Sequence, residues 1–167
     1  PIVQASASAQ LLIIGQAPGA KAHTSGRPWS DQSGERLRHW TGLSDARFYD
    51  AACVAIVPAG LCYPGAVPGG GDKPPVPTCA PLWHTQILPL LTNVRLTLLV
   101  GLNAQKLFLD GRQSLTEIVR QHPDNSPFLP LPHPSWRVVH WMKKNPWFEM
   151  EALPNLRARV ERALNRD

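Results

Sequence analysis

Short apolar segments alternate with longer amphipathic ones along this chain. The apolar segments cover residues 11–14, 51–57, 95–100 and 128–131. Each is short and continuous, which is typical of a strand buried on both faces. The amphipathic segments predict helices over residues 34–40, 80–91, 103–109, 114–122 and 154–165. Strands that alternate with helices indicate a parallel sheet, so we expect one domain over residues 1–167, an α/β fold built as a three-layer α/β/α sandwich with a central four-stranded parallel sheet.

The segments between these elements are rich in proline and glycine. The chain has 18 prolines among 167 residues, about twice the average usage. Residues 20–32 predict a polar loop, and residues 58–79 predict a long loop that contains a glycine triplet at positions 69–71. A loop of that length inside a compact domain is usually functional or mobile.

The charge balance favours a polyanionic partner. The chain carries 17 basic and 12 acidic residues, a net charge of +5. Such a balance suits nucleic acid, although an ordinary basic soluble protein has it too. No apolar run approaches the roughly 20 residues of a membrane span. Three cysteines, an odd number, favour a reducing compartment over a disulfide scaffold.

Two polar motifs follow directly after two of the predicted strands. The first, Gly15-Gln16-Ala17-Pro18-Gly19, is called the GQAPG loop, and the second is His133-Pro134-Ser135. Because the carboxyl ends of parallel strands form the ligand crevice of an open α/β sheet, the two loops could form one site. The glycines allow a sharp turn and a close approach to a ligand, but a plain strand-to-helix turn has the same residues. The spacing of a dinucleotide fingerprint is absent.

These motifs, with Gly26-Arg27-Pro28-Trp29 between them, resemble the uracil-DNA glycosylase superfamily. The GQAPG loop is closest to the GEAPG motif of its thermostable iron–sulfur branch. The later pattern HPSxRxxxWxKKNPWFE, the segment Phe48-Tyr49-Asp50 and the CYPG segment at residues 62–65 resemble a bacterial subgroup of that superfamily. The resemblance covers roughly residues 11–164. It implies a DNA glycosylase of base excision repair that flips a deaminated base out of DNA and hydrolyses its N-glycosidic bond, with uracil as the main expected base.

The resemblance also implies roles for Asp31 and Trp29. They lie in a stretch similar to the GRPFxGDxSG pattern of another branch, whose aspartate is its proposed catalytic residue; Asp31 matches it after a one-residue gap. A carboxylate there stabilises an oxocarbenium-like sugar or steers water, and the alternative is an N-cap, by Asp31 or Ser33, of the helix over residues 34–40. Trp29 takes the place of a phenylalanine that stacks on the flipped base, and the alternative is a core aromatic residue.

A third implied role is that of His133, which would donate a hydrogen bond to the carbonyl oxygen of the leaving base. A purely structural hydrogen bond is the alternative. The residues expected to contact DNA are Ser135, Trp136, Arg137, Lys143 and Lys144. The first three would meet phosphate or wedge into the base stack, and the two lysines suit phosphates or form a solvated surface.

The GQAPG loop supplies no acid. Gln16 can orient a water or a base edge but cannot act as a general base, so we assign it a supporting catalytic role. Gly15, Ala17, Pro18 and Gly19 are expected to shape the base pocket. Members that read uracil usually carry an asparagine after the second strand, and residues 51–58 have none. A catalytically silent relative that binds DNA or a nucleobase therefore remains an alternative, as does a nucleotide-processing enzyme unrelated to DNA.

The cysteines suggest a metal site without completing one. Cys62 and Cys79 are spaced like two late cysteines of the iron–sulfur branch, but the earlier Cys-x-x-Cys pair is missing. An iron–sulfur cluster or zinc would need such a pair upstream of Pro1; two inert thiols are the alternative. Cys53 is expected in the core. The chemistry itself requires no cofactor, and we expect a cytoplasmic, nucleoid-associated monomer that acts on DNA and not on membranes.

Overall fold

The centre of the fold is a sheet of four parallel strands, as predicted. The computed structural model describes residues 1–109 and 113–165. The strands are β1 (Leu11–Ile14), β2 (Val54–Ile56), β3 (Leu96–Val100) and β4 (Phe128–Leu131), in the order β2-β1-β3-β4. All three pairings are parallel. Since β2 and β3 add to opposite sides of β1, the chain changes direction across the sheet, and a crevice is expected at the carboxyl ends of these strands.

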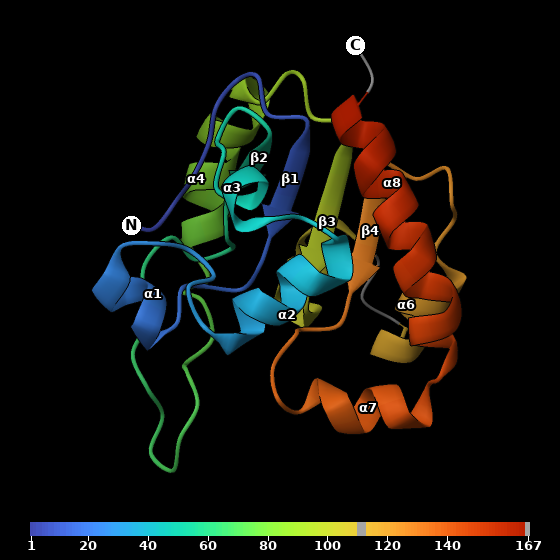
Figure 1. The fold of residues 1–167 in the computed structure, drawn as a ribbon. Coiled ribbons are helices and arrows are strands. Elements are labelled where there is room, and N and C mark those ends of the chain that lie inside the picture. Colours follow the sequence, from blue (N-terminus) through green and yellow to red (C-terminus); the bar gives the residue numbers. More distant parts are fainter. Residues whose placement is uncertain (110–112, 166–167) are drawn as a thin grey trace.

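Helices cover both faces of the sheet, which makes three layers (Figure 1). Leu11 and Ile13 of β1 face a large core that includes residues of α2 (Gln32–Thr41) and α8 (Leu153–Asn165). Leu12 and Ile14 face a second core with residues of α4 (Cys79–Ile87) and α5 (Leu102–Phe108). Every β1 side chain is therefore buried, because successive strand residues point to opposite faces.

The other predicted helices are present with small shifts of their ends. A 3-10 turn, Leu88–Leu90, extends α4, and α6 covers Leu115–Gln121 with a capping box at Ser114. The helix α5 starts one residue earlier than expected. Its N-cap is Gly101, and no side chain caps this end of the helix.

The sequence pattern did not predict several short helices, because their apolar residues do not repeat at a clear helical spacing. The predicted polar loop over residues 20–32 contains α1 (Ala20–Ser25), so that prediction is wrong in part. The structure also contains α3 (Asp45–Phe48), α7 (Val138–Lys144) and a π-helical turn at Phe148–Ala152. Helices this short depend on tertiary packing and carry little pattern of their own.

The second strand is shorter than predicted, because a turn occupies its expected start. The backbone N–H groups of Ala52 and Cys53 donate to Asp50, which folds residues 50–53 back. Cys53 therefore lies in this turn, with its thiol 3.3 Å from Asp50 Oδ2. Its predicted position in the strand is wrong, and its predicted place in the core is met in part, since the half-buried side chain packs against the large core. Burial, followed by the neighbouring Asp50, raises the pKa of this thiol.

The long loop after β2 contains a small antiparallel hairpin at residues 65–73, called the glycine hairpin. Ala66 and Asp72 form its bridge, and Val67 N donates to Gly71 O at 2.9 Å. The glycines at 69, 70 and 71 have φ of 88°, 102° and 95°, a region that other residues rarely adopt. The hairpin projects from the body below α1 (Figure 1). Within the described ranges, no helix has the length and apolar character needed to cross a membrane.

Candidate active site

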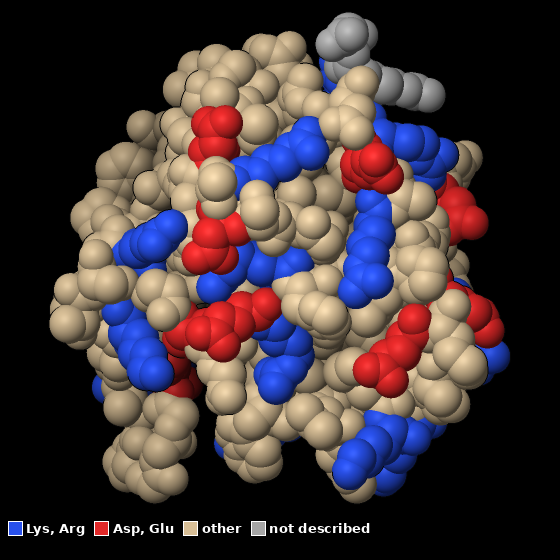
Figure 2. Space-filling model, in the orientation of Figure 1, with Lys and Arg blue, Asp and Glu red and all other residues tan. Residues whose placement is uncertain are grey.

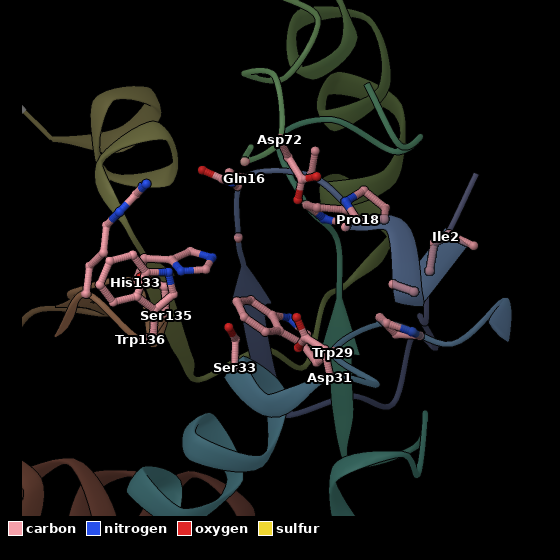
Figure 3. Close-up of a pocket in the computed structure, with 18 of the residues that line it drawn as sticks. Ile2, Gln16, Pro18, Trp29, Asp31, Ser33, Asp72, His133, Ser135 and Trp136 are labelled. Atoms are coloured by element: carbon pink, nitrogen blue, oxygen red, sulfur yellow. The ribbon is translucent and has the colours of Figure 1, made fainter. Parts of the chain in front are cut away.

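A cavity of about 700 Å³ opens at the carboxyl end of the sheet. Most of its wall comes from the GQAPG loop, residues 28–33, the glycine hairpin and residues 133–137, called the HPS loop. Its size is in the range of sites that bind small molecules or single cofactors. Figure 3 shows polar side chains from these segments around one central space.

Most of the predicted site residues line this cavity. They are Gly15, Gln16, Ala17, Pro18, Gly19, Trp29, Asp31, His133, Ser135, Trp136 and Arg137. Lys143 and Lys144 lie elsewhere, exposed at the end of α7. The two motifs that follow β1 and β4 in the sequence are thus brought together, as the parallel sheet requires.

Trp29 is held in a strained conformation at the cavity wall. It has φ of 55°, which costs a non-glycine residue about 1–3 kcal/mol. Arg38 Nη1 and the Tyr49 hydroxyl both donate to its carbonyl oxygen at 3.0 Å. Its indole packs against Gly15, where an added Cβ would lie 2.8 Å from the ring. Trp29 therefore packs on the core cluster and also lines the cavity, which combines its two predicted roles.

The donors to Trp29 belong to a small network that sequence reasoning missed. Arg38 Nε pairs with Asp45 at 2.7 Å, and the Arg27 guanidinium lies 3.4 Å from the centre of the Tyr49 ring. Burial raises the pKa of Tyr49, against an opposing effect of Arg38 and Arg27. The hydroxyl accordingly stays protonated and can donate to Trp29. The Phe-Tyr-Asp segment of the sequence was the available signal, although it does not disclose this contact.

Asp31 is the N-cap of α2 and also a wall of the cavity. Its Oδ1 accepts a hydrogen bond from Gly34 N at 3.0 Å, and its side chain lines the cavity. Ser33 is not the cap. A Cβ at Gly34 would overlap the carbonyl oxygen of Trp29, so this glycine allows Asp31 and Trp29 to share one tight turn. The capping role predicted for Asp31 is confirmed, and it leaves the carboxylate at the cavity.

His133 lies opposite Trp29, with ring centroids 5.6 Å apart and a tilt of 35°. Burial lowers its pKa, and the carboxylates of Asp31 and Asp72 act in the other direction. The imidazole is therefore mainly neutral near pH 7 and can donate one hydrogen bond. Arg36 Nη1 donates to Pro134 O at 2.6 Å, which fastens the HPS loop to α2.

Two further residues of the site were not predicted. Asn103 Nδ2 donates to Gln16 Oε1 at 3.1 Å, which orients the Gln16 amide. Asp72, at the base of the glycine hairpin, lines the cavity as a second carboxylate. It is the one acidic residue between positions 58 and 79 of the sequence, a signal that could have singled it out. Asn103 lies in α5, which follows β3, and its contact with Gln16 depends on the fold.

The cysteines contribute no metal site within residues 1–109 and 113–165. No group of three or more His, Cys, Asp and Glu side chains comes together there as metal ligands. Cys62 is exposed, and Cys79 Sγ accepts a hydrogen bond from Leu61 N at 3.3 Å. Two thiols alone do not fit a cluster or a structural zinc, each of which takes four ligands.

A family model described as the uracil DNA glycosylase superfamily matches residues 3–157, nearly the whole chain. The matched region includes every segment that lines the cavity except Ile2. The fold, the two motifs at one edge of the sheet and this match agree, and the chain belongs to the uracil DNA glycosylase superfamily.

Proposed function

We propose that this protein is a DNA glycosylase that flips a deaminated base out of DNA and hydrolyses its N-glycosidic bond, with uracil as the preferred base. The main support is that Trp29, Asp31 and His133 line the same cavity. An aromatic face, a carboxylate and a neutral hydrogen-bond donor are the groups that this reaction uses. Membership of the superfamily supports the same reaction class.

In the proposed reaction, the flipped base stacks on Trp29, a contact worth about 1–3 kcal/mol per base. The bond between the base and sugar C1′ breaks, and the base takes the electron pair. The Asp31 carboxylate stabilises the cationic sugar that remains. His133 donates a hydrogen bond to the base carbonyl oxygen, where negative charge develops. Water then bonds to C1′, and its proton is released to the departing base or to solvent.

The mouth of the cavity suits a DNA strand. Trp136 there is 72% exposed, and the Arg137 guanidinium lies 5.2 Å from the centre of its ring. An exposed aromatic side chain beside a cation fits a residue that enters the base stack next to a phosphate. Lysine and arginine side chains also gather over α7, where Lys143 and Lys144 are exposed (Figure 2). We assign these lysines to phosphates further along the strand.

Excision from defined oligonucleotides tests the proposal. Labelled strands with one uracil, hypoxanthine or xanthine are incubated with the protein, and the abasic product is cleaved with alkali and resolved on a gel. We expect product from the uracil strand, and loss of it in Asp31→Asn and His133→Ala. The matched control is Asp124→Asn, since Asp124 contacts Asn155 away from the cavity lining.

A silent base-binding protein is the second candidate, favoured by a GQAPG loop without an acid. It would bind uracil-containing DNA and release no base from any of the three strands. DNA binding that weakens steeply with salt would support either candidate and speak against a nucleotide enzyme unrelated to DNA.

A further inference from the structure

Asp72 reaches the cavity from a segment that none of the recognised motifs contains. The bridge between Ala66 and Asp72 and the hydrogen bond from Lys73 N to Gly65 O at 2.8 Å set its position in the glycine hairpin. Its Oδ2 lies 3.1 Å from the point that a Cβ of Gly19 would occupy. Because Gly19 has no side chain, the carboxylate can rest directly against the GQAPG loop.

The two carboxylates of the cavity lie on different sides of it. Figure 3 shows Asp72 with Pro18 and Gln16 on one side, and Asp31 with Trp29 on the other. His133 responds to both, since each of the two acids raises its pKa against the larger effect of burial. Asp31 is next to the stacking residue, whereas Asp72 is next to the loop expected to shape the base pocket. The two acids are thus placed for different tasks.

We infer that Asp72 determines base specificity, by accepting a hydrogen bond from the ring N–H that deamination creates. The inference rests on the proposed function and names the group that reads the base. An ionised carboxylate only accepts hydrogen bonds, whereas the Gln16 amide and the hydroxyls of Ser33 and Ser135 can both donate and accept. The negative charge of Asp72 therefore lets this part of the cavity wall distinguish a hydrogen-bond donor on the base from an acceptor.

Deamination changes the base in the way that a carboxylate detects. The ring N3 of cytosine is a hydrogen-bond acceptor, and in uracil it becomes an N–H donor. The ring N1 of adenine changes likewise in hypoxanthine. A carboxylate attracts the N–H and repels the lone pair, and we expect the unmatched contact to lower affinity about 10- to 100-fold. This discrimination takes the place of the asparagine that residues 51–58 lack.

The test measures binding of free bases to the complex of the protein with abasic DNA, by calorimetry at about pH 8. The ligands are uracil, N3-methyluracil, in which the N–H is blocked, and cytosine. In the natural protein we expect uracil to bind at least 10-fold more tightly than the other two. Asp72→Ala removes the acceptor and should reduce uracil affinity about 10-fold or more and remove most of that preference, while Asp72→Glu keeps part of it. Asp124→Ala is the matched control and should leave uracil affinity and the preference unchanged.

A second variant approaches the same contact from the opposite side. Gly19→Ala places a methyl group against Asp72 Oδ2, and we expect it to weaken uracil binding in the same selective way. Since Asp72 is exposed and outside both core clusters, its variants should melt at the temperature of the natural protein. A uniform loss of affinity for all three ligands would overturn the inference, because a structural defect does not distinguish an N–H from a lone pair.

The outcomes separate this inference from the proposed function. If the protein excises uracil and Asp72→Ala keeps the full preference for uracil over cytosine, the inference is wrong and the glycosylase proposal stands. If it excises nothing while the preference depends on Asp72, the inference stands and the catalytic proposal is wrong. If it neither binds these bases nor excises uracil, both are wrong.

Discussion

Asp31 offers a test in which two roles of one carboxylate are separated by two substitutions. Its Oδ1 caps α2 through Gly34 N at 3.0 Å, and its side chain also lines the cavity. Asparagine caps a helix about as well as aspartate, and alanine does not. Asp31→Asn therefore removes the charge and keeps the cap, whereas Asp31→Ala removes both.

The expected magnitudes differ for stability and for catalysis. Both variants lose the interaction of the charge with the helix dipole, about 0.3–1 kcal/mol. Asp31→Ala loses about 1 kcal/mol more with the cap. For a protein of 167 residues this corresponds to a melting temperature about 2–4 °C below that of Asp31→Asn. In the proposed reaction both variants lose the carboxylate that stabilises the cationic sugar, and loss of one such electrostatic contact typically lowers kcat about 10²- to 10³-fold.

Single-turnover excision from a uracil-containing strand and differential scanning calorimetry measure the two effects. We expect Asp31→Asn and Asp31→Ala to be equally slow and to differ in melting temperature. Excision by Asp31→Asn at the natural rate would refute the catalytic role and leave Asp31 as a helix cap alone. Asp124→Asn again serves as the matched control, since it removes a carboxylate that contacts Asn155 and does not line the cavity.

Three other variants test the remaining parts of the site. Tyr49→Phe removes a donor to the Trp29 carbonyl oxygen, so we expect about 0.5–1.5 kcal/mol lower stability and a higher KM with little change in kcat; an unchanged KM in steady-state excision would contradict this. Burial lowers the pKa of His133 below 6.5, so below about pH 6.5 the unfolded chain binds more protons at this residue than the folded protein does. The free energy of unfolding should therefore fall as the pH falls from 6.5 toward the lowered pKa and then level off. In His133→Gln the free energy of unfolding, measured with urea, should change less steeply with pH in that window. An equally steep change with pH would argue against a buried neutral imidazole. Lys143→Ala and Lys144→Ala should each make the slope of log K for DNA binding against log salt concentration shallower by about 0.9, and should leave excision at saturating DNA intact. An unchanged slope would mean that these lysines do not contact phosphate.

The sequence predicted structure best where burial requires a continuous run of apolar residues. A strand covered on both faces needs apolar side chains at every position, and β1, β3 and β4 could be located within one residue for this reason. Turn chemistry is equally local, so an Asp or Ser cap before α2 was predictable from the adjacent residues. Placement of the GQAPG loop and the HPS loop at one edge also followed, because parallel strands end on the same side.

Contacts between distant segments required the tertiary structure. Tyr49 is 20 positions from Trp29, and Asn103 is 87 positions from Gln16, yet each forms a hydrogen bond that orients its partner. Asp72 enters the cavity because the glycine hairpin folds toward the GQAPG loop, and no periodic pattern records such a fold. The short helices α1, α3 and α7 depend likewise on the surfaces they pack against. The sequence alone thus determines the layers of the fold and the edge of the sheet that holds the site, because burial and turn geometry act over a few residues. Only the tertiary structure decides which side chains meet across the cavity, because those side chains come from segments far apart in the sequence.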